Sequence, residues 1–137
     1  MPPATARYVT AVLFLIPAVI HLTPLSGVLG ADALARLYGL DFSEPNLQIL
    51  MRHRAVLFGL LGALLLTAVF RASYRTLALW AGFASVLSFL LIAATSGEYG
   101  VAVARVVLAD WVALASLSLA AVLHWRTPLA GQLPPGS

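Results

Sequence analysis

Six ionisable residues of this sequence lie inside or beside its apolar stretches, where a charged side chain is costly unless it has a partner or a function. They come from three separate stretches and are His21, Arg52, His53, Arg54, Arg105 and Asp110. The planar guanidinium of arginine suits the oxygens of a carboxylate, a phosphate or a quinone, and histidine exchanges a proton near neutral pH. These residue types predict a cationic pocket that binds an anion or a polar headgroup, with His21, His53 and Asp110 as candidates for proton transfer.

Two other interpretations of the same residues remain open. In the first, the polar groups are structural: Asp110 neutralises one arginine, and the remaining arginines extend to the lipid headgroups. In the second, His21, His53 and Asp110 supply ligands to a metal ion, although the neighbouring arginines would repel a cation. We therefore predict neither a metal site nor a cofactor.

The composition places these residues in a membrane protein. Of the 137 residues, 61% are hydrophobic and only 9% are charged, against about 45–50% and about 25% in a typical globular chain. A domain this small exposes much of its surface. A surface this apolar requires lipid as its solvent. The eight basic residues are scattered arginines, without the basic face and interleaved aromatic residues that indicate nucleic acid. The composition excludes a soluble enzyme and a nucleic-acid-binding domain, and the lack of cysteine excludes disulfides.

Four apolar stretches can each cross a bilayer core of about 30 Å, which requires a helix of about 20 residues. We predict an all-α integral membrane four-helix bundle, a single domain over residues 1–126, followed by a disordered tail over residues 127–137. The expected spans are residues 8–29, 44–71, 76–95 and 101–123.

The segment between the first two spans predicts a short helix along the membrane interface. Residues 31–40 carry apolar side chains at helical spacing, and we expect Gly39 to end the helix. Ser43, Glu44 and Pro45 then form a helix-start signature, with Ser43 as the capping residue.

Counting residues along the expected helices brings the polar groups to one level. Arg52 to Arg54, Asp110 and His21 each lie about 12–15 Å from the same end of the bundle. Asp110 is the only acidic residue inside an apolar stretch, so we expect its carboxylate to contact Arg54. If these side chains do not meet, Asp110 is a free acid that awaits a proton or a ligand.

Small residues at a spacing of four predict close helix contacts inside the bundle. The second span offers Ala55, Gly59, Ala63 and Thr67. The competing interpretation of this stripe is an interface with a second copy of the chain or with another membrane protein.

The distribution of charge predicts an orientation in the membrane. An even number of spans places both termini on one side. That side carries four arginines and no acidic residue: Arg7, Arg71, Arg75 and Arg126. The acidic residues expected on the other side are Asp32, Asp41, Glu44 and Glu98. That side also carries four arginines, Arg36, Arg52, Arg54 and Arg105, but three of them lie inside expected helices and are poor signals of orientation. We predict a multi-pass membrane protein with both termini in the cytoplasm. A cleaved signal peptide fits less well, because the first apolar run exceeds the length of a signal sequence.

One block of the sequence resembles small four-helix inner-membrane proteins of proteobacteria. It runs from Leu50 to Gly62 as LMRHRAVLFGLLG and is preceded by HLTPLSGVLG at residues 21–30. Such proteins are often labelled phosphopantetheine adenylyltransferase, but the enzyme of that name is soluble, has an α/β fold and carries a His-x-Gly-His motif that this sequence lacks. The layout of the spans is also similar to the DoxX-like group, some of whose members are associated with quinone-linked oxidoreductase complexes.

These observations favour an accessory or ligand-binding membrane protein that holds a quinone or a lipid headgroup in the outer-leaflet half of the bundle. The first alternative is a membrane-embedded acid/base enzyme acting on a lipid-soluble substrate, with His53 or His21 as the base. The second alternative is an assembly subunit of a larger membrane complex. The sequence leaves open whether the protein is an enzyme.

Overall fold

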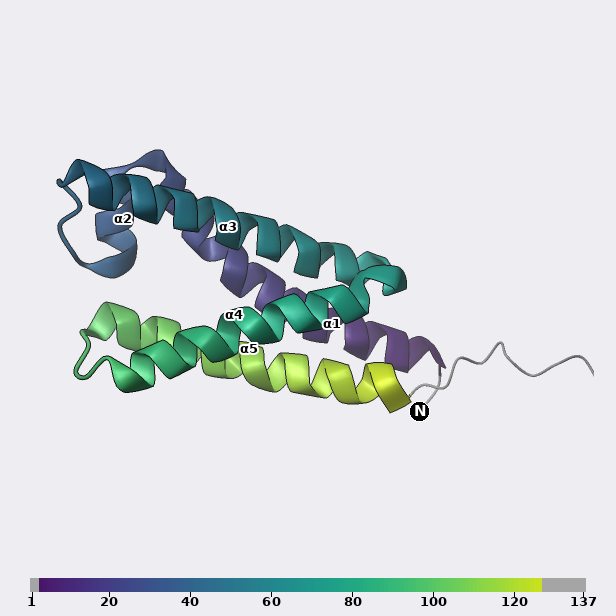
Figure 1. Cartoon of the computed structure of the whole chain (residues 1–137). Helices are drawn as coiled ribbons and strands as arrows, with labels where there is room; N and C mark the ends of the chain where they lie inside the picture. The colour runs from purple at the N-terminus through teal and green to yellow at the C-terminus, as the bar shows by residue number, and fades with distance from the viewer. Residues whose placement is uncertain (1–2, 127–137) are drawn as a thin grey trace, which may run out of the picture.

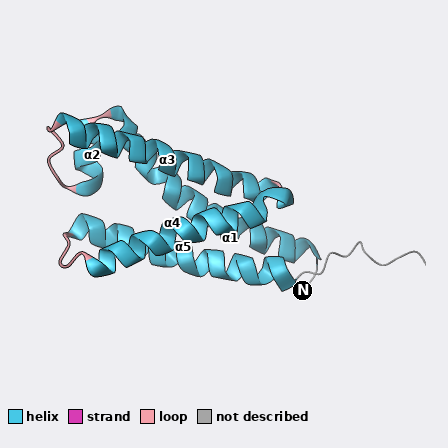
Figure 2. Cartoon of the chain, viewed as in Figure 1, coloured by secondary structure: helices cyan, strands magenta, loops and turns pink. Residues whose placement is uncertain are grey.

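The computed structural model describes residues 3–126, and these form helices joined by short turns (Figures 1 and 2). The elements in chain order are α1 (Pro3–Leu22), the 3-10 helix η1 (Thr23–Leu29), α2 (Ala31–Tyr38), α3 (Pro45–Phe70), the 3-10 turn η2 (Ala72–Tyr74), α4 (Arg75–Thr95) and α5 (Val101–Arg126). The all-α four-helix bundle is confirmed, and so is the short helix between its first two long helices. The expected disorder over residues 127–137 lies outside the described residues.

The four long helices pack so that each contacts two neighbours. Helix α1 packs against α3 and α5, and α4 packs against the same two helices. The N-terminal end of α1, the C-terminal end of α5 and the α3–α4 turn lie at one end of the bundle, which we call the terminal end (Figure 1). Helix α2 and the α4–α5 connection lie at the opposite end, where α2 contacts η1 and α5.

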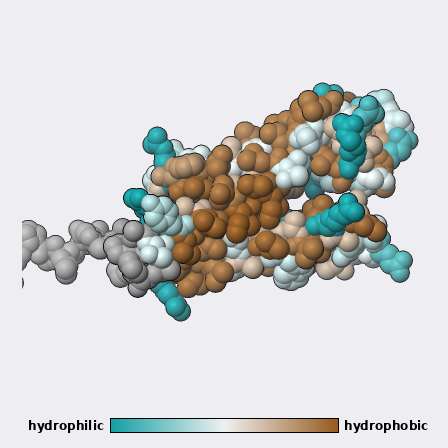
Figure 3. Space-filling model, turned by 180° about the vertical axis from the view of Figure 1, so that it is seen from behind, coloured by the Kyte–Doolittle hydropathy of each residue, from teal (hydrophilic) through white to brown (hydrophobic). Residues whose placement is uncertain are grey.

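The outer surface of the bundle is suited to lipid. Four segments are long and apolar enough to cross a membrane: Thr5–Leu29, Pro45–Phe70, Ala72–Thr95 and Val101–Arg126. Large apolar side chains such as Leu60, Leu91 and Leu108 are more than half exposed. Figure 3 shows a hydrophobic band over the bundle, with hydrophilic residues toward its two ends. The protein is therefore a small multi-pass integral membrane protein.

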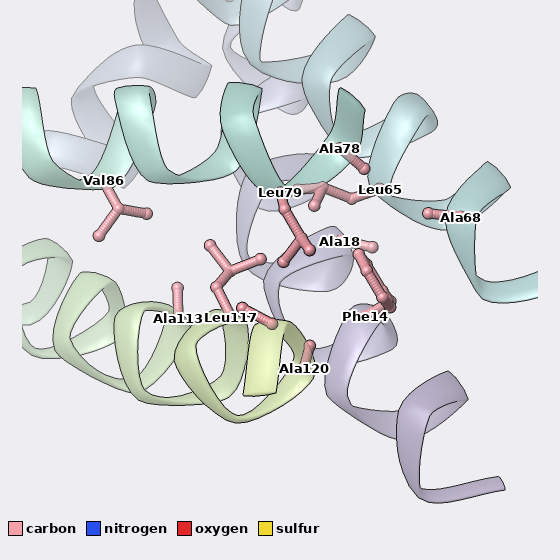
Figure 4. Packing of buried hydrophobic residues seen from close by; sticks show 11 residues of the cluster. Phe14, Ala18, Leu65, Ala68, Ala78, Leu79, Val86, Ala113, Leu117 and Ala120 are labelled. Atoms are coloured by element: carbon pink, nitrogen blue, oxygen red, sulfur yellow. The ribbon is translucent and has the colours of Figure 1, made fainter. Parts of the chain in front are cut away.

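The tightest packing lies in the half of the bundle near the terminal end. Phe14 of α1, Leu65 of α3, Leu79 of α4 and Leu117 of α5 are fully buried against one another and against small residues (Figure 4). Because alanine and glycine let helix backbones approach closely, this half is held by dense van der Waals contact. The ionisable residues predicted from the sequence mostly lie in the other half, where the packing is looser.

A proline and a serine join α1 to α5 inside this core. Pro17 has no N–H, so the carbonyl of Leu13, four residues earlier, lacks its usual helical donor. The hydroxyl of Ser116 on α5 donates to that carbonyl at 2.8 Å. A freed backbone carbonyl in a membrane helix needs such a partner because lipid supplies none.

Replacing Ser116 by alanine should therefore lower the thermal stability of the purified protein in detergent. We expect a loss of about 0.6–1.7 kcal/mol, the range measured for interhelical hydrogen bonds in membranes. Ser118→Ala is the matched control, because the exposed Ser118 hydroxyl donates within its own helix to the Leu114 carbonyl. Equal stability of the two variants would contradict the role given to Ser116.

Two ends of helices differ from the expectation. The first α-helix ends at Leu22, and the chain continues to Leu29 as a 3-10 helix rather than as one α-helical span. Pro24 explains this change, since it cannot donate an α-helical hydrogen bond. Helix α3 begins one residue after Glu44, and Glu44 rather than Ser43 is the capping residue.

The Glu44 carboxylate accepts hydrogen bonds from the backbone N–H groups of Asn46 at 2.9 Å and Leu47 at 2.6 Å. These bonds favour the charged form and lower the pKa of Glu44. Ser43 instead donates its N–H and its hydroxyl to Asp41 in the preceding turn. A cap charged at neutral pH therefore fixes the start of α3 and, with it, the rotation of the residues that follow.

The buried face of α3 follows the expected stripe of small residues only in part. The buried residues of α3 are Ala55, Gly59, Gly62, Leu65 and Ala68. The expected stripe was thus right for its first two members, but Ala63 is exposed. A spacing of four advances about 40° past a full turn, so a stripe of fours leaves the buried face after two steps.

Candidate functional site

A cavity of about 230 Å³ lies in the half of the bundle away from the terminal end. Helices α1, α2, α3, α4 and α5 all contribute to its lining, together with η1. Figure 3 shows the surface hollowed at this end. Four of the six residues predicted as site residues line the cavity: His21, Arg54, Arg105 and Asp110. Polar groups from three helices are therefore brought together at one level.

His21 is held in a fixed orientation. Its side chain is 1% exposed, and its Nδ1 lies 2.8 Å from the carbonyl oxygen of Pro17. Because a carbonyl only accepts, Nδ1 carries the proton of this bond. The Nε2 atom lies 3.3 Å from the Ser85 hydroxyl on α4, and in the neutral ring it accepts from that hydroxyl. The ring also packs against Phe58, with 5.6 Å between ring centres.

Arg54 is fixed by aromatic residues rather than by an acid. Its Nη1 donates to the Tyr38 hydroxyl at 2.9 Å. The guanidinium carbon lies 4.6 Å from the ring centre of Phe58 and 5.6 Å from that of Tyr38. Both distances are within the range of a cation–π interaction. Helix α2 thus has a defined task in the site, because it carries the tyrosine that orients the arginine.

Asp110 has no direct partner in residues 3–126. The side chain is 6% exposed, yet none of the described side-chain or backbone groups donates a hydrogen bond to it or forms an ion pair with it within 4.0 Å. Arg54 acts on it electrostatically from a greater distance. The expected direct contact with Arg54 is therefore wrong, because Arg54 turns to Tyr38 instead. The carboxylate oxygens are not sealed in the protein interior, and Asp110 lines the cavity.

The remaining arginines and His53 take different positions. Arg105 is exposed and lines the cavity from the first turns of α5. Arg52 is also exposed, and its Nε donates to the Val28 carbonyl at 2.9 Å, which ties α3 to η1. His53 is exposed. Neither Arg52 nor His53 lines the cavity.

Two further cavities adjoin the first. One of about 230 Å³ has a largely apolar lining that includes Phe42, Leu47 and Met51, and it shares four residues with the first cavity: Tyr38, Arg54, Phe89 and Val106. The other, of about 180 Å³, lies between α3 and α4 and includes Ser85. Arg54 lines all three cavities. Arg54 therefore lies where the cavity that contains His21 and Asp110 meets two more apolar cavities.

Sequence reasoning did not assign Tyr38, Phe58 or Ser85 to the site. Tyr38 was expected only as an apolar position of the short helix. Its hydroxyl reaches Arg54 because the chain reverses at Gly39, which has a left-handed φ of 66° and ends α2. A glycine after a short helix indicates a turn at this point of the sequence. The direction in which α2 lies is set by tertiary packing, which the sequence pattern does not show.

Within residues 3–126, no group of three or more histidine, aspartate or glutamate side chains is placed to hold a metal ion. Comparison with protein-family models, with curated proteins and with solved structures finds no match. The site must therefore be interpreted from its own geometry.

Proposed function

We propose that this integral membrane protein binds the polar head of a lipid-soluble molecule, a quinone or a lipid headgroup, in the cavity beside Asp110. One observation carries the proposal: an aspartate that is only 6% exposed lines a cavity without a partner among the described residues, and an arginine that is already oriented lines the same cavity. A buried charge without a partner is rare in membrane helices and is a mark of function.

Each residue has a definite part in this binding. Arg54 keeps N–H groups free beyond the one bound to Tyr38, and these donate to an oxygen of the ligand. The carboxylate of Asp110 is free to accept a hydrogen bond from any donor on the head. Arg105, at the exposed side of the cavity, attracts the head as it enters. The protein supplies binding and orientation with these groups alone.

Mass spectrometry of small molecules that copurify with the protein in mild detergent tests the proposal. We expect an amphiphile in stoichiometric amount with the native protein and a loss of about tenfold or more in Arg54→Gln, since hydrogen bonds from a charged group are strong. Arg36→Gln is the control, because Arg36 is an exposed arginine of α2 outside the cavity. Equal retention by both variants would exclude the cavity as the binding site.

A second candidate function is acid/base catalysis on the bound molecule, and the orientation of His21 favours it. The Nδ1 bond to Pro17 leaves Nε2 as the acceptor atom, which suits a general base. For this role the geometry favours His21 over His53. On incubation in deuterium oxide, the copurified molecule should then exchange carbon-bound hydrogen and gain mass with the native protein but not with His21→Gln. An unchanged mass in both cases leaves binding alone as the function.

We propose further that the protein lies in a bacterial inner membrane with its terminal end in the cytoplasm. The support is the charge pattern: arginines without acids at the terminal end, and the acidic residues at the other. Reporter fusions at Ser73 in the α3–α4 turn and at Gly97 in the α4–α5 connection provide the test. A cytoplasmic reporter should be active at Ser73 and a periplasmic reporter at Gly97, and the opposite pattern would reverse the orientation. The likeness to the DoxX-like group stays a prediction.

A further inference from the structure

Resting on the proposed function, we infer that the ligand is an amphiphile whose head carries a hydrogen-bond donor beside an acceptor. Its apolar chain lies in the adjoining cavity lined by Phe42, Leu47 and Met51. This inference narrows the cationic pocket expected from the sequence, because a head that only accepts hydrogen bonds no longer fits.

Asp110 requires that the head of the ligand carry a hydrogen-bond donor. An ionised carboxylate only accepts hydrogen bonds, and none of the described groups donates one to it. A head that offers oxygens alone, such as a simple phosphate or carboxylate, would place negative charge against this buried carboxylate. Like charges brought together in a cavity repel more strongly than in bulk water. A hydroxyl or ammonium group on the ligand, by contrast, supplies the missing partner.

The two arginines require that the head of the ligand also carry hydrogen-bond acceptors. Arg54 cannot act as an acceptor or lose its charge, and only its Nη1 is engaged by Tyr38. Its other N–H groups, together with Arg105 at the exposed side, require oxygens. The cavity therefore holds one acid and two arginines, and a head that both donates and accepts hydrogen bonds complements both kinds of group.

The size and lining of the cavities determine where the chain lies. The cavity beside Asp110 has a volume of about 230 Å³. Sites that enclose a whole drug-sized ligand are larger, at roughly 300–1,000 Å³. This cavity accommodates a head without its chain. The adjoining cavity has the same volume, is lined by Phe42, Leu47 and Met51, and meets the first at Arg54 and Tyr38. The chain accordingly passes this boundary into the apolar cavity.

Two kinds of membrane molecule share this chemistry. A quinol has hydroxyl groups that both donate and accept, and an ethanolamine phospholipid has an ammonium donor beside phosphate oxygens. Phosphatidic acid, whose head is a simple phosphate, serves as the contrast. Native mass spectrometry of the delipidated protein with equal amounts of decylubiquinol, dioleoylphosphatidylethanolamine and dioleoylphosphatidic acid compares the three directly.

We expect the native protein to retain decylubiquinol or the phosphatidylethanolamine at least about tenfold better than the phosphatidic acid. Whichever of the two is retained identifies the kind of membrane molecule that the site binds. Asp110→Asn should lose most of this preference, because the carboxylate that needs a donor from the ligand is gone. Met51→Trp, which fills the apolar cavity, should weaken retention of the preferred probe, whereas Ala63→Trp on the exposed face of α3 should not.

The outcomes separate the inference from the proposed function. If the phosphatidic acid is retained as well as the other probes and Arg54→Gln abolishes its retention, the cavity binds a head that only accepts hydrogen bonds, and the inference is overturned while the proposed function stands. If no probe is retained better by the native protein than by Arg54→Gln, the proposed function fails and the inference fails with it.

Discussion

Asp110→Asn should make the protein more stable to heat in detergent in the absence of ligand. The carboxylate is 6% exposed and receives no hydrogen bond from the described residues, so folding removes it from water without giving it a direct partner. Burying such a charge is costly. Asparagine has the same shape and no charge, and we expect a gain of about 1–3 kcal/mol. A residue that costs stability and is nonetheless present is one that a binding site would retain.

Arg54→Gln should have the opposite effect. It removes the bond to Tyr38 and the cation–π contact with Phe58, and it leaves Asp110 without the positive charge that acts on it. Differential scanning of purified single and double variants measures both effects. The double variant should be more stable than Arg54→Gln alone, because it no longer buries an uncompensated carboxylate. Asp110→Asn less stable than the native protein would instead mean that this carboxylate has a partner in the membrane.

The sequence alone does not predict that Asp110→Asn raises the thermal stability. An acid and an arginine at the same depth predict an ion pair, and the loss of either member of a pair destabilises. The expectation that His21, Arg54 and Asp110 lie at one level of the bundle agrees with the structure, which places all three around one cavity. The partner was wrong because α2 folds back and offers the Tyr38 hydroxyl to Arg54, an interaction between segments that counting along helices does not predict.

The same limit applies to the block of Arg52, His53 and Arg54. Successive residues of a helix point about 100° apart, so three neighbours cannot all face one cavity. The sequence fixes their spacing but leaves the rotation of the helix undetermined. Ala55 and Gly59, which are buried against α1 and η1, supply that rotation in the structure. With it, Arg54 faces the cavity, whereas Arg52 binds the end of η1 and His53 is exposed.

The contact of α3 with α1 also determines the second large effect, which we expect at Gly62. A Cβ atom at this position would lie 2.7 Å from Cγ of Leu22 and 3.1 Å from its backbone nitrogen. The nearby backbone means that turning the leucine side chain cannot by itself make room, and the helices must move apart. Gly62→Leu should therefore destabilise the protein by about 3 kcal/mol, the upper part of the usual range for overpacking, despite the better helix propensity of leucine.

Ala63→Leu provides the control, because it adds similar bulk one residue later on the exposed face of the same helix. Its thermal stability in detergent should stay close to that of the native protein. Gly62→Leu should also lose bound ligand, since Leu22 immediately follows His21, and moving α1 away from α3 separates His21 from Phe58 and from the cavity. If Gly62→Leu is as stable as Ala63→Leu and retains its ligand, α1 and α3 do not pack at the distance that closes this site.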